Sequence, residues 1–120
     1  MRLDVHLSEV EFRRVVAGPL ANGRHTRDAV EVIVDGESLA LGYDGAPLDV
    51  EHVKQMPTAR WFEAGTVSPI VCTCGDPACT DFTATVTRHG DWVGWRLWDG
   101  KKVVFDGTAA ATSLSDALND

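Results

Sequence analysis

Long apolar runs are missing from this chain of 120 residues, and so is any excess of positive charge. The apolar runs are only a few residues long, far short of the roughly 20 that a membrane-spanning helix needs. The first residues, Met1 to His6, lack the apolar region of a secretory signal. We therefore expect a cytoplasmic protein. Lysine and arginine number 11 against 18 aspartates and glutamates, which leaves no basic stripe for binding nucleic acid phosphates.

Familiar catalytic motifs are also absent from the sequence. It has no glycine-rich phosphate loop, no H-E-x-x-H and no G-x-S-x-G. Acidic residues are plentiful, but the sequence does not show any pair of them converging on a pocket. A non-catalytic role is therefore favoured, and enzymatic activity stays open as the alternative.

Length and composition predict one domain over residues 1–120. A chain of this size that is 44% hydrophobic can build one core but is too short for two ordinary domains. The net charge of −7 is concentrated in residues 29–87, which hold nine carboxylates against two basic side chains. An acidic surface usually serves solubility. It would also suit a basic protein partner, or mimicry of nucleic acid.

One clear local pattern predicts a β-hairpin over residues 29–41. Asp35-Gly36 separates two alternating runs, and this pair is typical of a two-residue hairpin turn. In that register one face of the hairpin is apolar and must be buried. The expected cross-strand pairs are Val34 with Glu37, Val32 with Leu39, and Val30 with Leu41.

Weaker patterns surround this hairpin. Alternation from Leu3 to Val16 predicts one long or broken strand. Residues 48–56 predict a short helix capped by Asp49 and ending before Pro57. Residues 58–69 predict an irregular connection in which one of the aromatic pair Trp61-Phe62 packs inward.

A second hairpin, over residues 82–98, is the strongest pattern in the chain. Turns at His89-Gly90 or Gly90-Asp91 both fit, and both give the same faces because they differ by two residues in register. A third strand over residues 102–105 would extend this meander through Asp99-Gly100. The predicted apolar face consists of Phe82, Ala84, Val86, Val93, Trp95 and Leu97.

The opposite face of the second hairpin is mixed, with Trp92, Arg96 and Trp98 beside alternating threonines. We expect another element to cover it, either the helix near Asp49 or a short C-terminal helix at Ser113, which has capping-box spacing. The alternative is an exposed patch, and exposed apolar patches often mark interfaces. Trp92, Arg96 and Trp98 are thus the candidate contacts to a protein partner.

All three cysteines lie within eight residues, at Cys72, Cys74 and Cys79. The first two are two positions apart, so in an extended segment their sulfurs project to one side, while Gly75 and Pro77 permit the turn that returns the third. Clustered thiolates repel one another without a cation, and Zn²⁺ prefers four ligands in a tetrahedron. The motif predicts a zinc site, with free thiols and a redox pair as alternatives.

No fourth cysteine is available to complete this site. His89 follows in sequence, but an extended strand from Phe82 to Arg88 would carry it about 20 Å away. Asp81 and Asp99 are expected at the nearer end, while His6, His25 and His52 could arrive from elsewhere in the fold. Affinity favours a histidine, with His52 as the first choice. Three thiolates and a water would make a poor hydrolytic centre because the sulfurs weaken the Lewis acid. We therefore expect structural zinc.

The segment from Cys72 to Cys79 resembles the C-x-C-G-x-x-x-C zinc knuckle that follows the catalytic domain of SET-type lysine methyltransferases. In that family a remote fourth cysteine completes the site. The likeness is confined to these eight residues, and it implies zinc ligands without methyltransferase activity. The knuckle with the following strand and Val93-Gly94-Trp95 is also similar to small uncharacterised bacterial proteins that pair such a knuckle with a later V-x-W. That resemblance implies a bacterial origin and no particular activity.

Together these patterns predict an α+β domain of mostly antiparallel strands with one or two short helices, in which zinc fastens the end of a sheet. The expected function is protein binding, in the manner of a small acidic immunity, antitoxin or adaptor protein. Two alternatives remain. One is a thiol- or zinc-dependent enzyme that uses Cys72, Cys74 or Cys79, and the other is a metal-free domain.

Overall fold

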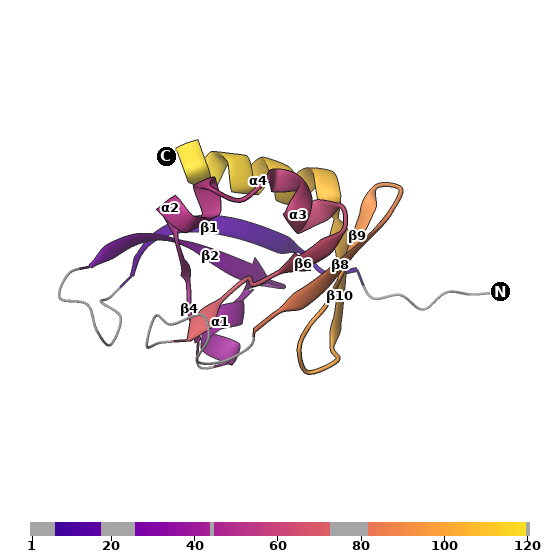
Figure 1. The fold of residues 1–120 in the computed structure, drawn as a ribbon, viewed down its shortest axis with the longest axis horizontal. Helices are drawn as coiled ribbons and strands as arrows, with labels where there is room; N and C mark the ends of the chain where they lie inside the picture. The colour runs from indigo at the N-terminus through magenta and orange to yellow at the C-terminus, as the bar shows by residue number, and fades with distance from the viewer. Residues whose placement is uncertain (1–6, 18–25, 44, 73–81, 120) are drawn as a thin grey trace.

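The strands are antiparallel and the helices are mostly short, which confirms the α+β prediction (Figure 1). This computed structural model describes residues 7–17, 26–43, 45–72 and 82–119. The elements in chain order are β1 (Val10–Ala17), β2 (Arg27–Val34), β3 (Glu37–Ser38), α1 (Leu39–Gly42), β4 (Gly45–Ala46), β5 (Leu48–Asp49), α2 (Val50–Lys54), α3 (Thr58–Phe62), β6 (Gly65–Val67), β7 (Val71–Cys72), β8 (Ala84–His89), β9 (Trp92–Arg96), β10 (Lys102–Asp106) and α4 (Gly107–Asn119). Within the described residues, no helix is long and apolar enough to cross a membrane.

The first sheet has the order β1-β2-β3, with β5 also paired to β2. Its turn between β2 and β3 is the predicted two-residue one, since Val34 pairs with Glu37. Asp35 and Gly36 both have positive φ, at 52° and 83°, as the favoured two-residue hairpin turn requires. Alternation buries Phe12, Val30 and Val32 on one face of this sheet.

The prediction that the second strand of this hairpin reaches Leu41 is wrong. Ser38 ends β3 because its side chain accepts a hydrogen bond of 3.3 Å from the backbone nitrogen of Leu41 and so caps α1. Leu39 is buried as expected, but Leu41 is 78% exposed. Val30 pairs with Leu48 of β5 instead.

The second sheet has the order β10-β9-β8-β6 and contains the predicted meander. His89 pairs with Trp92, which selects the turn at Gly90-Asp91 from the two that the sequence allowed. The predicted apolar face is buried at Val86 and Trp95, among others. Leu7 forms a parallel bridge to Val104 of β10 before the chain enters β1, so the start of the described chain links the two sheets.

Helix α3 replaces the irregular connection predicted for this region, and both of its aromatic residues are buried. Trp61 is 1% and Phe62 3% exposed. Neighbouring residues on a helix project about 100° apart, so both rings can enter a core between two sheets, which neighbouring residues on an extended chain cannot do. Phe12 stands edge-on to Trp61, with ring centroids 5.3 Å apart. A helix this short depends on such packing rather than on its own propensity.

Helix α4 begins at Gly107, directly after β10, and not at Ser113 as predicted. The carboxylate of Asp106 caps it by accepting hydrogen bonds from the backbone nitrogens of Thr108 (2.9 Å) and Ala109 (3.2 Å). The hydroxyl of Ser113 instead accepts a 3.0 Å hydrogen bond from the backbone nitrogen of Phe12. The helix therefore lies along the outer edge of β1 and closes it to further strands.

The predicted helix after Asp49 is present as α2 and ends before Pro57 as expected. The side chain of Asp49 makes no capping hydrogen bond, however. Its carboxylate pairs with Arg27 of β2 instead. The expected side-chain cap is therefore wrong, because a guanidinium on the neighbouring strand competes for the same carboxylate.

The buried apolar side chains of both sheets and of α1, α2, α3 and α4 form one continuous cluster. Figure 1 shows α3 and α4 side by side on one side of the strands, with α1 and β4 on the opposite side. The inner face of the second sheet packs into this cluster. Its outer face is left without a covering helix in the described part of the chain.

Candidate functional site

The outer face of β8, β9 and β10 is organised in cross-strand rows. The register aligns one outward residue of each strand with one of the next, and the intervening residues point into the core. The three rows are Thr85 with Arg96 and Lys102; Thr87 with Gly94 and Val104; and His89 with Trp92 and Asp106.

This face is open, so the expectation that a helix covers it is not met within the described residues. The Trp92 side chain is 42% exposed, and Leu7, next to β10 through its bridge to Val104, is 47% exposed. The described chain has only four large apolar side chains this exposed. Two of the four therefore belong to one sheet and its edge.

A hollow of about 420 Å³ lies on this face, with Trp92, Arg96 and Lys102 among the residues that line it. Gly94 occupies the middle row and has no side chain. A Cβ atom there would lie 3.0 Å from the hydroxyl oxygen of Thr87. A glycine inside a strand often marks a point where another group approaches the backbone closely. Here it lowers the floor of the hollow beside the exposed indole.

The hollow is cationic although the chain carries a net charge of −7. Arg96 and Lys102 are direct cross-strand partners, and neither has an ion pair with another described residue. Like charges in this arrangement repel. The one carboxylate in the three rows, Asp106, is committed to the backbone nitrogens of α4. No carboxylate lines the hollow itself.

Trp98 does not belong to this hollow, although it was grouped with Trp92 and Arg96 in the predicted patch. Its ring lies 5.0 Å from that of Phe82 and 4.8 Å from that of Tyr43, measured between centroids. It is half-buried. The chain leaves the strand at Arg96, so the period-two alternation that placed Trp98 on the outer face no longer applies there.

Tyr43 also holds the adjacent turn. Its hydroxyl donates a 2.6 Å hydrogen bond to the carboxylate of Asp99. Burial raises the pKa of Tyr43 to about 12, with contributions from the hydrogen bond to Asp99 and from the charge of Asp99. The same hydrogen bond, together with one from the backbone nitrogen of Lys101, lowers the pKa of Asp99.

The predicted metal ligands are only partly within the described structure. Cys74 and Cys79 lie outside the described residues, as does the side chain of Cys72, whose backbone pairs with Gly45 of β4. His52 is exposed on α2, which lies on the same side of the strands as α4, whereas β4 lies on the other (Figure 1). Among the described residues, no three His, Cys, Asp or Glu side chains gather into a possible metal site. Zinc binding stays a prediction.

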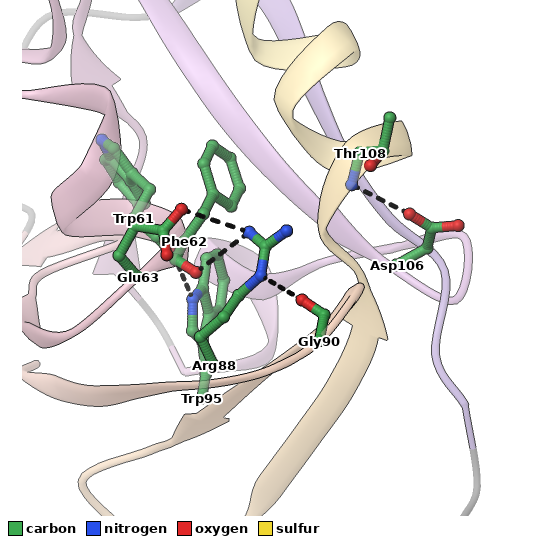
Figure 2. Close-up of polar contacts among 8 residues, drawn as sticks. All are labelled: Trp61, Phe62, Glu63, Arg88, Gly90, Trp95, Asp106 and Thr108. Atoms are coloured by element: carbon green, nitrogen blue, oxygen red, sulfur yellow. Dashed lines mark hydrogen bonds and ion pairs between the residues drawn. The ribbon is translucent and has the colours of Figure 1, made fainter.

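Arg88 is a structural residue of this region that the sequence reasoning missed. It follows Ala84 and Val86 on the inward side of β8, so a charge on an otherwise apolar face was the available signal. Figure 2 shows its guanidinium donating to the carbonyl oxygens of Gly90 (2.6 Å) and Phe62 (3.4 Å) and lying 3.5 Å from the Glu63 carboxylate. These contacts fasten α3 to the back of the strands that carry the hollow.

Comparison of the chain with protein-family models, curated protein sequences and solved structures finds no match. The function of the hollow is therefore inferred from its own chemistry and shape.

Proposed function

We propose that this protein is a non-catalytic protein-binding module and that its contact surface is the open face of β8, β9 and β10. The observation that carries the proposal is the exposed indole of Trp92, 42% accessible, beside the bare backbone at Gly94. Trp and Arg are the residues most enriched at the energetic centres of protein interfaces. Trp92 and Arg96 line the same hollow.

Binding is favoured over catalysis by what lines this hollow. The lining includes two threonines, a histidine, two tryptophans and two cations. A nucleophile needs a base within hydrogen-bond reach, and within the described residues no hydrogen bond joins His89 to a hydroxyl group. The strands beneath are braced by Arg88, which suits a rigid, preformed contact surface.

We further propose that Cys72, Cys74 and Cys79 bind structural zinc with a fourth ligand. Support comes from the residues that flank segment 73–81. Cys72 is held by its pairing with β4, and Phe82 is held by its ring contact with Trp98, which also contacts Tyr43 just before β4. The described residues on either side of the segment are thus tied to neighbouring groups, and this supports the proposal that the three thiolates bind one ion.

We propose His52 as the fourth ligand of this site on affinity grounds, because an imidazole suits Zn²⁺. Asp99 is a second candidate because it is anchored next to Trp98. Reduced thiolates also agree with the proposed cytoplasmic location.

The binding proposal is tested by affinity capture with variants of the full chain. Trp92→Ala and Arg96→Ala should each reduce capture of the partner about tenfold. Both side chains are exposed, so the thermal midpoint should stay within about 2 °C. Leu41→Ala is the matched control, because Leu41 is a more exposed apolar side chain outside the hollow. A partner that binds all three variants equally would overturn the proposal.

A further inference from the structure

We infer that the partner segment bound in this hollow is extended and acidic, with an apolar side chain two positions from an Asp or Glu. This inference rests on the proposed function, because it assigns the chemistry of the partner at the same surface. It depends on three features of the face: its unbalanced charge, the order of its rows and the spacing between them.

The charge is unbalanced at one end of the hollow. Arg96 and Lys102 face each other across β9 and β10, and no described carboxylate pairs with either. The chain as a whole is acidic, with a net charge of −7. A carboxylate that reached this pair would relieve their mutual repulsion. Charge complementarity of this kind selects partners and orients them.

The rows run in a fixed order from charge to aromatic ring. The row of Thr85, Arg96 and Lys102 carries the two cations. The row of Thr87, Gly94 and Val104 lies next to it, and the row that contains His89 and Trp92 comes last. Successive rows are two residues apart along the strands, or about 7 Å. An extended peptide has the same repeat for side chains on one side. If an apolar side chain of the peptide rests on Gly94 against Trp92, the peptide side chain two positions away therefore lies over the Arg96–Lys102 pair.

A nucleic acid could also use an indole and two cations, but the face fits it less well. Binding along a polynucleotide requires a series of cations that follow the phosphates. In the rows described here the cationic side chains cluster at one end, and Trp92 lies next to Asp106. An acidic peptide needs only one such cluster. Binding of a polynucleotide to this face is therefore the alternative result that the experiment distinguishes.

The experiment selects ligands with the wild-type protein from a library of random linear 12-residue peptides. We expect the enriched peptides to carry an excess of Asp and Glu, with an apolar residue two positions from an acidic one. Arg96→Glu and Lys102→Glu should each lower the affinity for the best peptide about tenfold. Lys54→Glu, the same change on the exposed side of α2, should leave binding unchanged. A peptide with its acidic residue replaced by Lys should recover affinity for Arg96→Glu.

The possible failures separate the inference from the proposed function. The inference that the segment is acidic would be wrong if the enriched peptides were neutral or basic. It would also be wrong if Arg96→Glu and Lys54→Glu lost peptide affinity equally. If those peptides still lost binding in Trp92→Ala, the binding surface itself would stand. A library without enrichment, together with an Arg96-dependent complex of a 20-nucleotide single-stranded DNA, would assign the face to nucleic acid. Peptides that bind independently of both Trp92 and Arg96 would remove the proposed surface altogether.

Discussion

The indole nitrogen of Trp95 donates a hydrogen bond of 2.9 Å to the backbone carbonyl oxygen of Trp61 (Figure 2). It joins β9 to α3 through the centre of the core, where the two rings lie 5.9 Å apart. The indole nitrogen of Trp61, also buried, has no hydrogen-bond partner among the described residues. Two equally buried tryptophans in one cluster thus differ in their polar contacts.

This difference predicts unequal effects of the same substitution. Trp95→Phe leaves the buried carbonyl oxygen of Trp61 without its donor, which costs about 1–3 kcal/mol in addition to the lost ring volume. Trp61→Phe loses similar volume but removes a donor that has no partner. We expect the free energy of unfolding, measured in urea with the m value monitored, to fall by at least about 1 kcal/mol more for Trp95→Phe. Equal losses would show that the hydrogen bond does not contribute.

Gly107→Ala should destabilise the protein although alanine favours helices. A Cβ atom at this position would lie 2.8 Å from Cγ2 of Val93 and 3.0 Å from Nη1 of Arg88. Overpacking of this kind costs about 1–3 kcal/mol, which exceeds the gain of up to about 1 kcal/mol from helix propensity. Ser115→Ala, at an exposed site of the same helix, should be neutral or slightly stabilising. A rise in the melting temperature of Gly107→Ala would contradict the tight contact.

The pair formed by Tyr43 and Asp99 predicts a loss of stability in alkaline solution. The pKa of Tyr43 is raised from 10.0 to about 12, mainly by burial, so folding favours the protonated phenol. This contribution is complete below pH 10 and is lost as the pH rises from about 10 to about 12. The pKa of Asp99 is lowered from 3.8, mainly by the hydrogen bond from Tyr43. Its contribution is therefore present above that pH and is lost below it.

The alkaline effect can be measured directly because Tyr43 is the only tyrosine. Its phenolate absorbance should titrate near pH 12 in the folded protein and near pH 10 in denaturant. Tyr43→Phe should show a smaller decrease in melting temperature between pH 10 and pH 12 than the wild type does. A phenol that titrates at its ordinary pKa in the folded protein would refute the burial of its hydroxyl group against Asp99.

Removal of the proposed zinc should loosen the fold. We expect about one zinc per chain on elemental analysis, a lower melting temperature with a chelator, and the same loss in Cys79→Ser without chelator. The chelator should then have no further effect on Cys79→Ser. Metal content near zero under reducing conditions, with all three thiols open to alkylation, would support the metal-free alternative. Unchanged stability with altered thiol reactivity would favour thiol chemistry.

The sequence predicted most accurately those parts of the fold that local rules control. The meander from residue 82 to residue 106 follows from alternation and from Gly90-Asp91, and its register leaves little freedom once one face is buried. The turn at Asp35-Gly36 was equally clear, since it needs two residues that accept positive φ. The α+β class followed from these same elements.

Other parts of the fold depended on contacts between distant residues. Helix α3 forms because Trp61 and Phe62 both fit between the two sheets. The start of α4 depends on Asp106 at the end of β10. In the candidate site, Trp92 and Arg96 share the hollow as their alternation predicted, but Trp98 lies elsewhere because the strand ends before it.

Taken alone, the sequence determined which side chains share a face of each strand, because alternation is a property of the extended backbone itself. Tertiary structure decided which of those faces stays open. The helix at the C-terminus was free to cover either the outer face at Trp92 or the edge of β1, and its hydrogen bonds with Phe12 and Arg14 direct it to the edge. The open face of β8, β9 and β10 therefore results from long-range packing, which no local pattern contains.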